Sequence, residues 1–184
     1  MALTARFDVN QVDDGINWQF SDIESVDNDR TPEDPHWNRD IDFSAGQAFR
    51  VAISASDQDK TGFESLEVID CCIITRPRIL SCGPGVLTKY GPPSLFVDYE
   101  GKQLGAMYSI DPATFSVHST GMTPAQGRKV TLLWNGSLIV GPYNGFWEIS
   151  FYVTVSIQRA NEEAQLRVFY FDPEGEISNG TNPP

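Results

Sequence analysis

Hydrophobic and polar residues alternate most clearly between positions 147 and 157. The odd positions are all apolar and the even positions are mostly polar, starting from Trp147 and Glu148 and ending at Ile157. A period of two is what a β-strand shows when one face packs on an apolar core and the other faces water or a second layer. The pattern therefore predicts a strand over residues 147–157.

The same alternation recurs along the rest of the chain. Residues 3–9 and 16–20 predict two strands with a tight connection, and residues 66–75 are mostly apolar and β-branched, which is typical of a central strand. Further short strands are expected at residues 49–55, 95–99, 104–110, 130–134, 138–140 and 166–171, and Phe115 and Val117 mark a short segment between them. No segment shows the 3.6-residue periodicity of a long helix.

Turn residues separate these segments. Glu100, Gly101 and Lys102 predict a hairpin between residues 95–99 and 104–110. Asn135 and Gly136, a dipeptide that tolerates positive φ, predict that residues 138–140 return beside the strand before them. Short strands with Gly and Pro punctuation indicate an all-β fold. We expect an antiparallel β-sandwich, jelly-roll or Greek-key-like, with about nine or ten strands, or a closely related barrel.

The length of 184 residues suits a single domain over 1–184. Residues 27–42 are rich in carboxylates and contain two prolines, so they predict a long acidic surface loop. Residues 175–184 predict a short flexible tail.

The charge balance narrows the list of partners. With 13 Lys and Arg against 25 Asp and Glu, the formal net charge is -12, which repels phosphate backbones and anionic membrane surfaces. We therefore expect no nucleic acid and no membrane as partners. The first residues lack the pattern of a secretory signal, and no stretch is apolar enough to span a bilayer.

These features predict a cytoplasmic protein with free thiols at Cys71, Cys72 and Cys82. A bridge between Cys72 and Cys82 stays open as an alternative in an oxidising compartment.

Two acidic segments resemble cation sites. Asp57, Asp59, Thr61 and Gly62 match the first half of a calcium loop, but Val68 stands where that loop requires a bidentate Glu. The alternative is a hydrated hairpin turn. A second cluster includes Asp27 and Asp29, which would bind a hard cation only if their loop folded back on itself. Calcium is the one cofactor that these residues suggest; otherwise none is expected.

The neighbours His36 and Trp37 are candidates for ligand binding. A Trp in a polar loop can stack on a sugar, or it can cover one end of the core, where its large apolar surface is buried. No nucleophile motif and no phosphate-binding glycine loop is present, so the sequence predicts no catalytic residues and no enzyme.

The C-terminal strands carry a resemblance to a known family. An aromatic alternating strand over residues 147–153, a polar turn, and a last strand that ends in Phe169, Tyr170, Phe171, Asp172 and Pro173 resemble the bacterial AidA/PixA inclusion-body protein family. The resemblance implies a β-sandwich that accumulates in the cytoplasm, without catalytic residues to transfer.

Aromatic residues also suggest self-association. If the alternation continues through the last hairpin, Tyr152, Phe169 and Phe171 lie on the outward face. We therefore expect a homodimer or higher homo-oligomer, and a non-enzymatic self-associating protein of the AidA/PixA type. The alternatives are a carbohydrate-binding, lectin-like module assisted by calcium, with a glycan as its partner, and a small hydrolase.

Overall fold

The computed structural model describes residues 1–21, 41–78, 91–123, 127–143, 145–171 and 177–178. Within these ranges the regular structure is β, apart from one 3-10 turn, η2 (Pro112–Thr114). The prediction of an all-β fold is confirmed. No helix among the described residues has the length and apolar character needed to cross a bilayer.

One sheet is built around β4. In it β2, β1, β4, β10 and β6 are neighbours in that order, and β9 joins β4 to β8. Its strands are β1 (Ala2–Asp8), β2 (Asn17–Ser21), β4 (Ala48–Ser56), β6 (Phe96–Val97), β8 (Phe115–Thr123), β9 (Gly127–Trp134) and β10 (Leu138–Val140).

The other sheet is built around the two longest strands, which pair antiparallel with each other. Its order is β3, β13, β11, β5 and β7, and β12 pairs with β11. Its strands are β3 (Ile41–Asp42), β5 (Phe63–Arg78), β7 (Met107–Ser109), β11 (Phe146–Arg159), β12 (Gln165–Phe171) and β13 (Ile177–Ser178).

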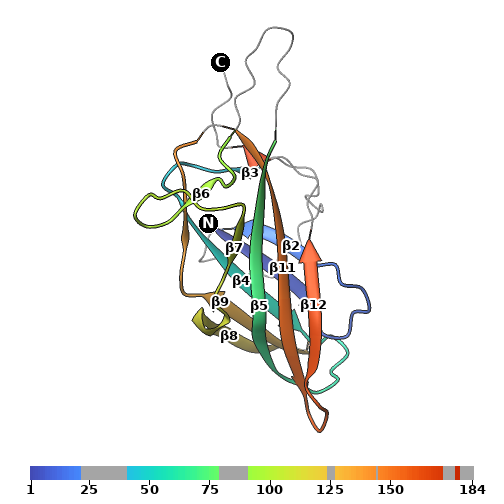
Figure 1. The fold of residues 1–184 in the computed structure, drawn as a ribbon. Helices are drawn as coiled ribbons and strands as arrows, with labels where there is room; N and C mark the ends of the chain where they lie inside the picture. Colours follow the sequence, from blue (N-terminus) through green and yellow to red (C-terminus); the bar gives the residue numbers. More distant parts are fainter. Residues whose placement is uncertain (22–40, 79–90, 124–126, 144, 172–176, 179–184) are drawn as a thin grey trace.

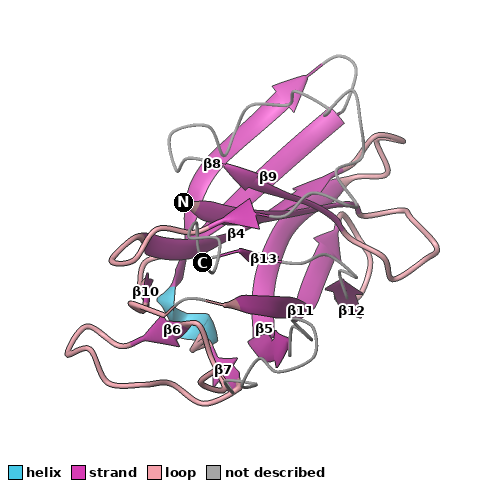
Figure 2. Cartoon of the chain, turned by 90° about the horizontal axis from the view of Figure 1, so that it is seen from above, coloured by secondary structure: helices cyan, strands magenta, loops and turns pink. Residues whose placement is uncertain are grey.

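The two sheets face each other and enclose one apolar core. Figure 1 shows β5, β11 and β12 side by side in the nearer layer with β1 and β4 behind them, and Figure 2 shows the two layers from above. Aromatic rings connect the layers: Phe7 of β1 stacks on Phe169 of β12 with ring centroids 4.1 Å apart, and Trp18 of β2 stacks on Phe171 at 5.1 Å. Stacked rings add about 1 kcal/mol each beyond their burial.

The predicted alternation of apolar and polar residues is confirmed in β11, where it was clearest. In β11 the apolar positions from Trp147 to Ile157 are at most 1% exposed, while the polar positions between them are partly exposed. The predicted hairpin at the N-terminus is also present, because β1 and β2 pair antiparallel with Leu3 opposite Phe20.

The predicted hairpin at Asn135 and Gly136 is wrong. Both β9 and β10 pair antiparallel with β4, so the chain continues along that strand instead of turning back. Gly136 is not needed for a positive φ. It is needed for space, because a Cβ there would lie 2.6 Å from the ring of Trp134. Asn135 and Gly136 therefore form a short break between β9 and β10, which pair with successive parts of β4.

Three other expectations need correction. The sheets are mixed, because β1 pairs parallel with β4 and β13 pairs parallel with β3. Parallel pairing is available to β1 and β4 because β2 and residues 22–40 provide a long connection between them. The end of the expected acidic loop forms β3, and part of the expected tail forms β13, which pairs with β11. The rest of both segments lies outside the described residues.

Candidate functional site

Several predicted site residues cannot be placed. Asp27, Asp29, His36 and Trp37 lie outside the described residues, and so does Cys82. The carbohydrate-binding interpretation depends on this segment and stays a prediction. Cys71 and Cys72 are buried and free, so Cys72 forms no bridge. Burial is the main reason that the pKa of the Cys71 thiol is raised, followed by the nearby Cys72 and Asp70.

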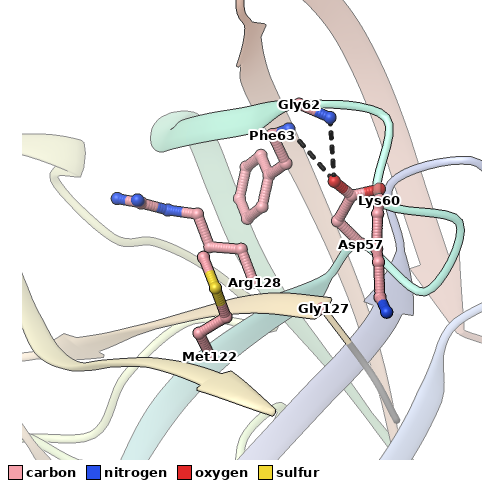
Figure 3. A pocket seen from close by; sticks show the side chains of 7 residues that line it. All are labelled: Asp57, Lys60, Gly62, Phe63, Met122, Gly127 and Arg128. Carbon is pink, nitrogen blue, oxygen red and sulfur yellow. Dashed lines mark hydrogen bonds between the residues drawn. The ribbon is translucent and has the colours of Figure 1, made fainter. Parts of the chain in front are cut away.

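The predicted calcium loop forms a tight turn around Asp57, the residue that follows β4. Asp57 is only 2% exposed, and five donors reach its carboxylate. Oδ1 accepts from Asn10 Nδ2 at 3.0 Å and from the N–H and hydroxyl of Thr61, both at 2.9 Å. Oδ2 accepts from the N–H groups of Gly62 and Phe63, both at 3.1 Å (Figure 3).

These hydrogen bonds give Asp57 a structural role in place of the predicted ligand role. N–H groups point at the oxygens that a calcium ion would need, and the hydroxyl of Thr61 donates to the same carboxylate. Asp59 is exposed and does not complete a site. In the described part of the chain no three His, Cys, Asp or Glu side chains converge to hold a metal ion.

The same contacts set the acidity of Asp57. Burial alone raises the pKa of this carboxyl, but the hydrogen bonds from the backbone of Thr61 and Phe63, and from the side chains of Asn10 and Thr61, outweigh it. They lower the pKa from 3.8 to about 2. The carboxylate therefore stays ionised while it holds the turn between β4 and β5.

The predicted self-association residues lie on different faces. Phe169 and Phe171 are 0% and 5% exposed, so their expected outward position is wrong. The register explains why: Phe169 is opposite Val153 and Phe171 is opposite Phe151, which both point into the core. The odd positions face inward in both β11 and β12, so the alternation continues unshifted through the turn and the even positions of β12 face outward.

Tyr152 lies on the outer face, opposite Tyr170 of β12 and Cys72 of β5. The pKa of the Tyr152 hydroxyl is raised. The largest cause is the charge of Cys72, followed by the hydrogen bond with Cys72, by burial and by Asp70. The hydroxyl therefore stays protonated beside β5.

The outward face of β12 carries residues that sequence reasoning missed. Leu166, Val168 and Tyr170 are 65%, 51% and 56% exposed and form an apolar row along one strand. Isolated exposed apolar residues are common, but three successive outward positions on one strand are a patch. The sequence contains this signal, because an inward Phe169 requires positions 166, 168 and 170 to face outward. We call these three residues the β12 row.

The free edge of β12 is covered by the connection between β1 and β2. The N–H of Tyr170 donates to Asp14 O at 3.1 Å. The Arg167 guanidinium lies over the Phe169 ring at 4.9 Å and donates to Gln11 O at 3.0 Å and to the Asp14 carboxylate at 3.1 Å. This edge is therefore closed to a further strand at Tyr170, whereas the face of β12 is open.

Comparison with protein-family models, with curated proteins and with solved structures finds no match to this chain.

Proposed function

We propose that this protein is a non-enzymatic structural protein that associates with a second copy of itself through the β12 row. The observation that carries the proposal is the exposure of Leu166, Val168 and Tyr170 on one strand. An exposed apolar patch of this kind is typical of a protein–protein contact. In this proposal the two layers are a sandwich of the jelly-roll or Greek-key type.

The spacing of the β12 row makes it self-complementary. Outward residues on a strand are about 6.7 Å apart, so Leu166 and Tyr170 are equally distant from Val168. A two-fold axis at Val168 places each Val168 against its copy and Leu166 against the partner's Tyr170. Symmetric pairing of one patch with itself is the usual geometry of a homodimer.

Charge favours the same contact. The chain carries a net charge of -12, so most approaches bring like charges together. The β12 row has no ionisable group other than the phenol of Tyr170, and the one cation of the strand, Arg167, is held by the β1–β2 connection. Association through the face therefore avoids the repulsion that other surfaces impose.

The cellular setting follows the resemblance of the C-terminal strands to the AidA/PixA family. We place the protein in the cytoplasm, where a reducing environment suits the buried free thiols of Cys71 and Cys72. Accumulation by self-association, without catalysis, is the role that this setting and the β12 row support.

Val168→Asp tests the proposal. Two carboxylates would face each other at the two-fold axis, so we expect the dimer dissociation constant to rise by about 100-fold or more. Sedimentation velocity at micromolar concentration measures this, with the wild type above 20.4 kDa and the variant at 20.4 kDa.

Val117→Asp is the matched control, because Val117 is 62% exposed on β8 of the other sheet. This variant should associate as the wild type does. A wild type that sediments only as a monomer, or equal association of Val168→Asp and wild type, would overturn the proposal. Thermal unfolding of both variants shows whether each has kept its fold.

A further inference from the structure

A groove of about 540 Å³ opens where β8 and β9 meet the segment that follows Asp57. Its walls bring together Lys60, Phe63, Met122 and Arg128, which come from three separate parts of the chain. Figure 3 shows Phe63, Met122 and the stem of Arg128 grouped on one side, and Lys60 on the other side of Asp57. The volume lies within the usual range for a site that binds a small molecule.

The grouped side offers an apolar surface. Phe63 is 3% exposed and belongs to the core, so its ring is a fixed wall. Met122 is 78% exposed, which is unusual for a large apolar residue and leaves its flexible thioether available for contact. A hydrocarbon chain lying against these two side chains would remove apolar surface from water.

The groove also offers positive charge. Neither Lys60 nor Arg128 forms an ion pair with another described residue. The Nε of Arg128 is buried and has no hydrogen-bond partner, and an unpaired buried donor costs about 1–3 kcal/mol. Asp57 supplies the carboxylate in the groove wall. It does not pair with these cations, because both of its carboxylate oxygens accept hydrogen bonds from Asn10, Thr61, Gly62 and Phe63.

We propose that this groove binds a medium-chain aliphatic carboxylate. Its carboxylate pairs with Arg128, and its chain lies along Phe63 and Met122. A charged headgroup alone would gain little in a chain of net charge -12, and a neutral alcohol would leave Arg128 without an ion pair. The ligand therefore needs both parts, and the site is independent of the self-association surface on β12.

Octanoate titrated into the full chain tests the proposal, with isothermal calorimetry for affinity and the Met122 methyl resonance for location. We expect saturable binding, a shift of the Met122 methyl signal, and binding of octan-1-ol and of acetate weaker by about tenfold or more. Arg128→Gln should weaken octanoate binding about tenfold, because the charge-assisted hydrogen bond is lost. Lys102→Gln is the control, because Lys102 is an exposed cation in another turn, and it should bind octanoate as the wild type does.

Met122→Glu provides a second variant that should keep the fold, because the side chain is exposed. It places a carboxylate in the groove and should abolish octanoate binding. No saturable binding by the wild type, equal binding of octanoate and octan-1-ol, or full binding by Met122→Glu would overturn the proposal.

Discussion

Replacing Asp57 with alanine is expected to lower the free energy of unfolding by about 3 kcal/mol or more. The substitution removes the acceptor for the N–H groups of Thr61, Gly62 and Phe63. The N–H of Phe63 is buried in the folded protein and finds no water to replace it. Urea denaturation followed by tryptophan fluorescence measures the effect.

Asp59→Ala is the matched control for this substitution. Asp59 lies in the same turn and is exposed, so its loss should change the free energy of unfolding by no more than about 0.5 kcal/mol. Equal stability of the Asp57 and Asp59 variants would contradict the structural role assigned to Asp57.

The lowered pKa of Asp57 adds a pH dependence to the same prediction. The contribution of its ionised form is complete above the unfolded pKa of 3.8 and is lost as the pH falls through the folded pKa of about 2. The shift corresponds to about 2 kcal/mol. The stability difference between wild type and Asp57→Asn should therefore shrink by that amount between about pH 6 and pH 2. A difference that stays constant over this range would contradict the assignment.

The elements that alternation defines strongly could be predicted from the sequence. Strand β11 and the β1–β2 hairpin follow from residues that are neighbours along the chain. The parallel pairing of β1 with β4 could not be predicted, because it depends on which of several compatible strand orders buries the core. The outward position predicted for Phe169 is wrong for a local reason. That prediction takes Leu166, Val168 and Tyr170 as the inward set, whereas the odd positions that face inward in β11 also face inward in β12.

The candidate site, like the fold, could be predicted from the sequence only in part. Asp57, Thr61 and Gly62 form the tight turn that their spacing indicates, but the sequence does not reveal that the donors of this turn occupy the carboxylate. The groove could not be predicted from the sequence either. Met122 and Arg128 reach Phe63 only after β9 has paired with β4.

Gly127→Ala is expected to destabilise the protein by about 3–5 kcal/mol. Gly127 starts β9 with φ of +63°, where a side chain is strained, and a Cβ built on it would clash with the carbonyl oxygen of Asp57. The two segments cannot separate easily, because Asp57 N–H donates to Arg128 O at 2.9 Å. Urea denaturation measures the loss.

Two other glycines separate strain from the close contact. Gly101 has φ of +80° and no atom within 4 Å of its Cβ position, so Gly101→Ala should cost only about 1 kcal/mol. Gly121 on β8 has neither a positive φ nor a close neighbour, so Gly121→Ala should be nearly neutral. A loss at Gly127 no larger than the loss at Gly101 would mean that β9 and the Asp57 turn can move apart, and the tight junction between them would then be refuted.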